Sequence, residues 1–294
     1  MFSSRYFCIL TMIALSALCG LAMTANAQDG LVQSDGAQIH YISKGTGTTT
    51  LVLIPGFATS TDVWKAQIEY FSRTMRVVAI DPRGQGQSSK TDDSNTPEQR
   101  AADYEKVLTS LGSTNIVLVG WSQGVQDVAA YVGQFGTKKL RGIVLVDAAV
   151  SKGTNAVRSN PDPVKGMLDE IDIYARYKRQ YLEGMMQAIF KKPLSPTDLA
   201  AFVETAMKTP TSQGVAMLTA DFLGRDRTSA LAKFNRPTLL IAAGDSAELA
   251  EQEAEVKRLP KGRLVKIDDA GHGVFIDQPK RFNETLESFL KELP

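Results

Sequence analysis

The chain has 294 residues, of which 43% are apolar and 22% charged, enough for one large hydrophobic core. Its 33 basic and 32 acidic residues almost cancel, so charge gives no reason to expect nucleic acid or an anionic membrane surface as a partner. Both cysteines, Cys8 and Cys19, lie near the N-terminus. The remainder can form no disulfide and offers no thiolate nucleophile or metal ligand.

The N-terminus, residues 1–27, is typical of a secretory signal peptide. Arg5 precedes the apolar run Phe7–Met23, and Ala25-Asn26-Ala27 is a small-x-small cleavage motif before Gln28. The apolar run is short for a bilayer span, which needs roughly 20 residues. We therefore expect the mature chain to be exported, to the periplasm or beyond, without a membrane span.

The rest of the chain alternates between short apolar runs and helical patterns. Continuous apolar strands separated by helices are typical of a mostly parallel sheet covered on both faces. The expected strands are Ile39–Ile42, Leu51–Ile54, Val77–Ile80, Ile116–Val119, Gly142–Val146, Thr238–Ala242 and Leu264–Ile267. The expected helices are Thr61–Ser72, Pro97–Leu111, Val125–Gln134, Ala247–Arg258 and Pro279–Leu290. The pattern predicts an α/β fold whose core comprises residues 28–150 and 231–294.

The helix expected at Pro97 has favourable start chemistry. Thr96 is placed to act as the N-cap, proline occupies the first helical position, and Gln99 completes a capping box. Just before it, Asp81 to Gly86 follows a strand and has no third glycine opening a helix. That loop is expected to be structural rather than a dinucleotide site.

The segment Gly120-Trp121-Ser122-Gln123-Gly124 joins an expected strand to an expected helix. Glycine on both sides allows a serine to adopt a strained turn that exposes its hydroxyl. A strand before it and a helix after it are the context in which this motif carries a nucleophile. The sequence therefore predicts Ser122 as a nucleophilic serine, with Trp121 packed beneath the turn.

A serine nucleophile needs a general base, and the chain has only two histidines. His40 lies in an alternating stretch near the start and is expected to be a packed strand residue. His272 lies between glycines, after the strand-like Leu264–Ile267 and before a helix. A histidine on a late loop fits the order serine, acid, histidine.

Residues 151–230 break the alternation of strands and helices. No strand run is evident, and four helical patterns occur, at 163–173, 174–190, 196–208 and 211–223. Inserted between two core strands, the segment is expected to form a helical cap. Its methionines fit either ordinary packing or an adaptable apolar pocket wall. Arg176, Lys178 and Arg179 are expected on a solvated helix face.

At this point the chain resembles the α/β-hydrolase superfamily, in its esterase and cofactor-free haloperoxidase-like branch. The resemblance rests on Leu51 to Phe57, on Asp81 to Ser88, on the Ser122 turn and on the His272 loop followed by Gln278-Pro279. Many relatives have His-Gly where this chain has Pro55-Gly56. The resemblance implies an α/β-hydrolase fold with a mostly parallel sheet and a Ser-acid-His triad.

The resemblance also indicates where the acid is to be found. In this superfamily the acid often follows the strand that corresponds to Thr238–Ala242, and Asp245 is the residue we expect there. Glu248 is one alternative. Asp147, at the end of the strand Gly142–Val146, is the other, because some relatives use that position. The acid would hold the imidazole tautomer and stabilise the imidazolium.

The expected activity is the hydrolysis of carboxylic esters through an acyl-serine, with the backbone N–H groups of Phe57 and Gln123 as the oxyanion hole. The substrate would be a small-molecule ester or related acyl compound. Acyl transfer, perhydrolysis, and lactone or carbon–carbon bond hydrolysis use the same triad, so they stay open. A non-catalytic binding protein with this fold is the alternative of another class. We expect no cofactor and no metal, since metal-ligand spacing is absent from the sequence.

Overall fold

The computed structural model describes residues 27–91, 93–159 and 162–294. The predicted signal peptide lies outside these ranges, apart from Ala27, and stays a prediction. Among the described residues no helix is both long and apolar enough to cross a bilayer.

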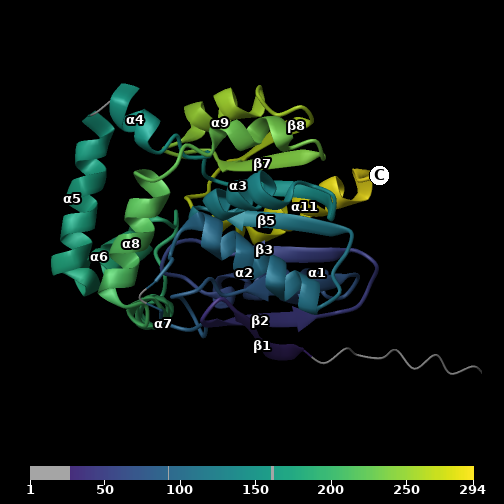
Figure 1. Ribbon diagram of the computed structural model, residues 1–294, viewed down its shortest axis with the longest axis horizontal. Coiled ribbons are helices and arrows are strands. Elements are labelled where there is room, and N and C mark those ends of the chain that lie inside the picture. Colours follow the sequence, from purple (N-terminus) through teal and green to yellow (C-terminus); the bar gives the residue numbers. More distant parts are fainter. Residues whose placement is uncertain (1–26, 92, 160–161) are drawn as a thin grey trace, which may run out of the picture.

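The core is an eight-stranded sheet with the order β1-β2-β4-β3-β5-β6-β7-β8 (Figure 1). β1 and β2 form an antiparallel hairpin, β2 pairs antiparallel with β4, and the other neighbours are parallel. The strands are β1 Gln28–Ser34, β2 Ala37–Lys44, β3 Thr50–Ile54, β4 Arg76–Ile80, β5 Ile116–Trp121, β6 Leu140–Val146, β7 Thr238–Ala243 and β8 Gly262–Ile267. The predicted mostly parallel α/β sheet is confirmed, and β1 was not foreseen.

Helices cover both faces of this sheet (Figure 1). Successive side chains of a strand point to opposite faces, so Leu118 joins the cluster beneath α2 and α3, while Val117 and Val119 join the cluster around α1 and α11. The core helices are η1 Thr61–Trp64, α1 Lys65–Phe71, α2 Pro97–Ser110, α3 Gln123–Phe135, η2 Thr228–Lys233, α9 Leu249–Val256, α10 Val274–Asp277 and α11 Pro279–Glu292. Burial on both faces explains why the central strands are apolar over most of their length.

The start of α2 follows the predicted chemistry in part. Thr96 Oγ1 accepts the Gln99 N–H at 3.2 Å, and Pro97 occupies the first turn. The Gln99 amide, however, donates to Asp103 Oδ1 at 3.4 Å. Asp103 is the buried partner of Arg83, so Gln99 extends that ion pair instead of completing the capping box.

His40 and the loop from Asp81 to Gly86 form one buried structure. His40 Nδ1 lies 2.8 Å from Asp81 Oδ2, and His40 Nε2 lies 2.7 Å from Asp29 Oδ1. Asp81 Oδ1 also accepts the Thr61 N–H at 2.6 Å. These contacts tie β1, β2, η1 and the loop together, which is the structural role expected of both the histidine and the loop.

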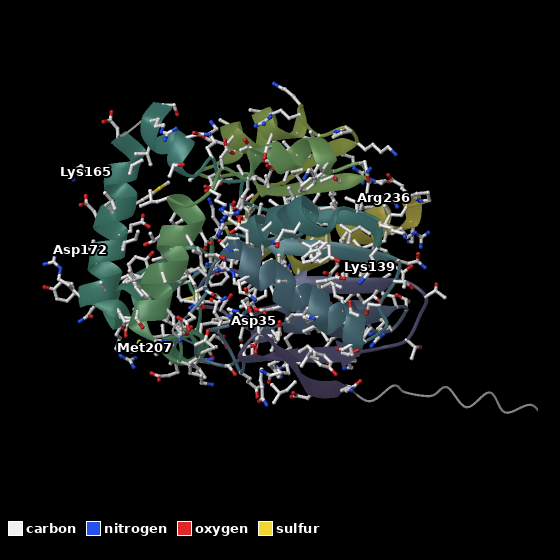
Figure 2. All side chains as sticks on the ribbon, in the orientation of Figure 1. Asp35, Lys139, Lys165, Asp172, Met207 and Arg236 are labelled. Carbon is white, nitrogen blue, oxygen red and sulfur yellow. The ribbon has the colours of Figure 1, made fainter. Side chains whose placement is uncertain are left out.

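The chain between β6 and β7 forms a group of helices on one side of the molecule (Figure 1). We call these the cap helices: α4 Thr154–Ser159, α5 Asp162–Arg176, α6 Lys178–Ala188, α7 Pro196–Met207 and α8 Thr211–Phe222. Their shared core contains Tyr174, Met186 and Met217, and Phe57 of the sheet domain packs into it. Because α5 carries Lys165 and Asp172 on its outer side, one face of the group is highly charged (Figure 2).

Candidate active site

Ser122 lies at a sharp turn between β5 and α3. Its backbone has φ 56° and ψ −121°, a conformation that costs a non-glycine residue roughly 1 to 3 kcal/mol. The turn is closely packed: a Cβ on Gly120 would lie 2.3 Å from the Gly124 carbonyl oxygen, and one on Gly124 would lie 2.9 Å from that of Ile54. The two glycines therefore permit the strained turn that the motif predicted.

The imidazole of His272 is held by a buried carboxylate, that of Asp147. His272 Nδ1 lies 2.8 Å from Asp147 Oδ2, and Asp147 Oδ1 accepts the Ala243 N–H at 2.8 Å. Asp147 is 2% exposed, while the His272 side chain is 30% exposed. An ionised carboxylate only accepts hydrogen bonds, so in a neutral imidazole at this position Nδ1 carries the proton and Nε2 keeps its lone pair.

The structure corrects the expected position of the acid. Asp245 follows β7 as predicted, but its carboxylate is 66% exposed and pairs with Lys191. Among the described residues, the end of β7 reaches the site through the Ala243 N–H, which donates to Asp147. Glu248, the other alternative, accepts the Ala149 N–H at 2.8 Å. Of the three candidates, only Asp147 bonds to the imidazole.

The loop that carries His272 is fixed from two sides. Trp121 is buried, and its indole N–H donates to the His272 carbonyl at 2.9 Å. The Gly273 N–H donates to the Ile189 carbonyl, at the end of cap helix α6, at 2.8 Å. A Cβ on Gly273 would lie 2.3 Å from the Phe190 ring, so the cap segment could not pack here against a larger residue.

These contacts bring the serine and the histidine–aspartate pair to one edge of the sheet. Trp121, directly before Ser122, has its ring centroid 5.4 Å from that of His272. The Ser122 N–H donates to the Val146 carbonyl, directly before Asp147, at 3.1 Å. Ser122, Asp147 and His272 thus follow β5, β6 and β8 at their carboxyl ends, where open parallel sheets place their sites.

Two backbone amides, those of Phe57 and Gln123, belong to segments at this turn. The Gln123 N–H is the first of α3, and the first N–H groups of a helix have no acceptor within it. The loop at Gly56 packs against Ser122, because a Cβ on Gly56 would lie 3.0 Å from Ser122 Cβ. Among the described residues, neither the Gln123 N–H nor the Phe57 N–H donates a hydrogen bond. The Phe57 ring packs edge-on against Tyr174 of the cap at 5.4 Å.

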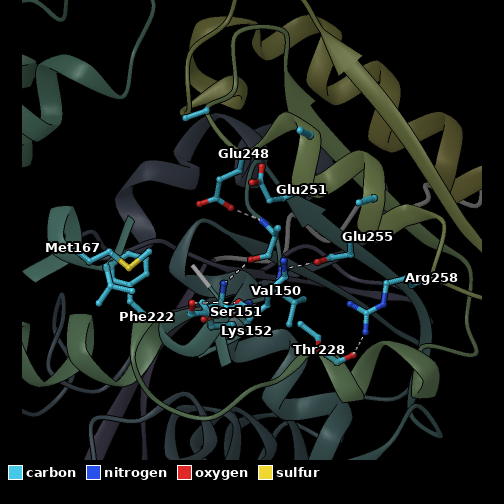
Figure 3. Close-up of a pocket in the computed structure, with 18 residues that line it drawn as sticks. Val150, Ser151, Lys152, Met167, Phe222, Thr228, Glu248, Glu251, Glu255 and Arg258 are labelled. Carbon is cyan, nitrogen blue, oxygen red and sulfur yellow. Dashed lines mark hydrogen bonds between the residues drawn. The ribbon is translucent and has the colours of Figure 1, made fainter. Parts of the chain in front are cut away.

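A cavity of about 630 Å³ adjoins the site between the cap and α9 (Figure 3). Its wall combines Met167 and Phe222 of the cap with Val150 and with Glu248 and Glu255 of the α9 region. Burial raises the pKa of Glu255 to about 7, although the Val150 N–H donates to its carboxylate. Ser122 and His272 are not among its described lining residues, so this cavity lies next to these two residues without containing them.

The fold and the serine–histidine–aspartate geometry define a hydrolase of the α/β class. The profile of the alpha/beta hydrolase family matches residues 51–285, and the chain belongs to this family. It is 29% identical over 276 residues to the non-heme chloroperoxidase CPO-A1 of Kitasatospora aureofaciens, covering 88% of this chain and 98% of that protein.

The chain is also similar to an esterase/perhydrolase in sequence and to a bromoperoxidase in structure. The bifunctional esterase/perhydrolase DCH of Acinetobacter calcoaceticus is 27% identical, covering 87% of this chain and 97% of that protein. The structure of a bromoperoxidase from Bacillus anthracis superposes with a TM-score of 0.82 at 23% identity, over 90% of this chain and all of that one. The predicted fold and the haloperoxidase-like branch are confirmed.

Proposed function

We propose that this protein is a serine hydrolase that cleaves carboxylic esters through an acyl-Ser122 intermediate. The observation that carries the proposal is the His272–Asp147 pair, fixed beside a serine on a strained turn. The family and the esterase and perhydrolase among its relatives support it.

The proposed reaction uses groups of the chain and water. His272 Nε2 takes the Ser122 proton as Oγ attacks the acyl carbon, and Asp147 stabilises the imidazolium that forms. The N–H groups of Phe57 and Gln123 bind the oxyanion, each donor contributing roughly 3 to 4 kcal/mol to lowering the barrier. The imidazolium protonates the leaving alcohol, and His272 then activates the water that releases the acid.

Perhydrolysis is the second candidate, favoured by the relative that is an esterase and a perhydrolase. In that reaction hydrogen peroxide replaces water as the acceptor of the acyl group, so the products are a peracid and free Ser122. Turnover of p-nitrophenyl acetate with and without peroxide, with peracid assayed, separates the two. Ester cleavage without peracid supports the hydrolase, and an absence of ester cleavage under both conditions contradicts both.

We also propose that the cap helices cover the substrate and that the chain is exported. Residues 151–230 would cover the substrate, and removal of residues 1–27 would release the mature chain. N-terminal sequencing of protein secreted by a bacterial host tests export. A chain beginning at Gln28 in the periplasm or medium supports it, and an uncleaved chain retained in the cytoplasm contradicts it.

A further inference from the structure

One carboxylate of the cap reaches the turn that carries the nucleophile. Asp221, in the last turn of α8, is 4% exposed. Its Oδ1 accepts a hydrogen bond from Arg100 Nη2 at 2.7 Å, and its Oδ2 accepts one from Gln123 Nε2. Gln123 directly follows Ser122, so the cap touches the residue whose N–H is the proposed oxyanion donor.

The Gln123 amide is held at both of its polar atoms. Besides the bond from Nε2 to Asp221, its Oε1 accepts from Gln85 Nε2 at 3.4 Å. Gln85 is buried in the loop after β4. With both ends of the amide fixed, the side chain of Gln123 keeps one conformation, and the first turn of α3 is held with it.

Buried charge prevents Asp221 from leaving this position easily. Arg100 is fully buried and bonds to both oxygens of Asp127 on α3 as well as to Asp221. Tyr104 also donates to Asp127, at 2.6 Å. Burial raises the pKa of Asp221, while Arg100 and Gln123 oppose that rise. A buried ion pair that loses one partner leaves an uncompensated charge, which is strongly unfavourable.

We propose that Asp221 is a positioning residue that couples the cap to the oxyanion hole. It touches no reacting atom and acts through Gln123: when α8 is seated, the Gln123 side chain is fixed and its backbone N–H is aimed for the oxyanion. The inference rests on the proposed function, because it assigns a purpose to that N–H.

A second tether of the same helix end provides a matched control. Arg227 donates to both oxygens of Glu98 at 3.0 Å each, and its guanidinium also bonds the carbonyl of Ala220, next to Asp221. Glu98→Gln therefore loosens this end of α8 without touching Gln123. Asp221→Asn weakens the contact to Gln123 and Arg100 while keeping the side-chain size.

The test measures kcat and KM for p-nitrophenyl acetate in both variants. We expect Asp221→Asn to lower kcat about tenfold or more with KM nearly unchanged, part of the roughly 100- to 1,000-fold effect of losing one oxyanion donor. Glu98→Gln should keep kcat within about twofold of wild type, because it loosens the same helix end without changing the contact to Gln123. Equal kcat changes in the two variants, or none in either, would overturn the inference.

Amide hydrogen exchange gives a readout that does not depend on turnover. Exchange in the peptide covering residues 122–128 should accelerate in Asp221→Asn and stay unchanged in Glu98→Gln. If Asp221→Asn does not fold, Gln123→Met removes the same contact from the other side and should give the same loss of kcat. Unchanged kcat and exchange in the folded variant contradict the proposal.

The wild-type enzyme separates this inference from the proposed function. A wild type that is not labelled at Ser122 by a fluorophosphonate would overturn both. A labelled wild type with full kcat in the Asp221 variant would overturn the positioning role alone.

Discussion

The molecule contains two histidine–aspartate pairs of the same length in very different surroundings. The pairs are His40–Asp81 and His272–Asp147. In both, the histidine Nδ1 lies 2.8 Å from an aspartate oxygen. At His40 the second nitrogen is also bonded, to Asp29, and the ring is 2% exposed. At His272 no described residue bonds Nε2, and the ring is partly open beside the serine turn.

The comparison shows that a histidine–carboxylate bond is by itself no sign of catalysis. His40 uses both nitrogens to join β1, β2 and the Asp81 loop, so it has no free lone pair for a proton. His272 uses one nitrogen for orientation and keeps the other available. What distinguishes a general base from a structural histidine is therefore the unoccupied nitrogen and its neighbour.

The largest expected effect comes from removing the two groups that exchange a proton in the proposed mechanism. Ser122→Ala and His272→Ala should each lower kcat for p-nitrophenyl acetate by roughly 10⁴-fold or more, because the nucleophile or its base is lost. His40→Gln is the control and should retain near wild-type kcat in the folded protein. Substantial activity in Ser122→Ala would contradict the assignment of the nucleophile.

The next largest effect distinguishes the two aspartates that were candidates for the acid. Asp147→Asn should lower kcat by roughly 10³- to 10⁴-fold, since an amide no longer fixes the Nδ1–H tautomer. Asp245→Asn, which removes only an exposed pair with Lys191, should leave kcat within about twofold. Steady-state kinetics of both variants check this, and the reverse order of losses would restore Asp245 as the acid.

The smallest expected effect is a change in thermal stability on replacing His40. Burial disfavours the charged His40, but the hydrogen bonds and charges of Asp81 and Asp29 outweigh it and raise its pKa above 6.5. Because the pKa of His40 is higher in the folded than in the unfolded protein, the charged His40 stabilises the fold. This contribution is complete at a pH below the unfolded-state pKa, and it is lost as the pH rises through the folded-state pKa.

Thermal unfolding between pH 5.5 and 9 measures this contribution. The difference in melting temperature between wild type and His40→Gln should be greatest near pH 5.5 and shrink as the pH rises. A difference that grows with pH would mean that His40 is held neutral in the fold.

The sequence was sufficient for seven of the eight strands, for the serine turn and for the histidine loop. The strands β3 to β7 were visible because burial on both faces makes most of their residues apolar. The Ser122 turn was visible because close packing requires its two glycines. β1 escaped notice because it is an edge strand with mostly exposed or half-exposed residues. A short half-solvated strand has no distinctive apolar pattern.

The acid could not be chosen from the sequence because several carboxylates follow strand ends. Asp147 and Asp245 both come within two residues of a buried strand, and their spacing to His272 carries no three-dimensional information. The choice depends on the turn geometry: Asp147 has φ 49°, which places its carboxylate between the Ala243 N–H and the imidazole. The buried contact of Asp221 to Gln123 was equally invisible, since the two residues are 98 positions apart.

The most direct test of the proposed chemistry is covalent labelling with a fluorophosphonate, followed by mass spectrometry of the digested protein. A serine activated by His272 and Asp147 should carry the probe on the peptide containing Ser122, and labelling should disappear in His272→Ala. An unlabelled folded wild type, or a label on a different serine, would contradict the account.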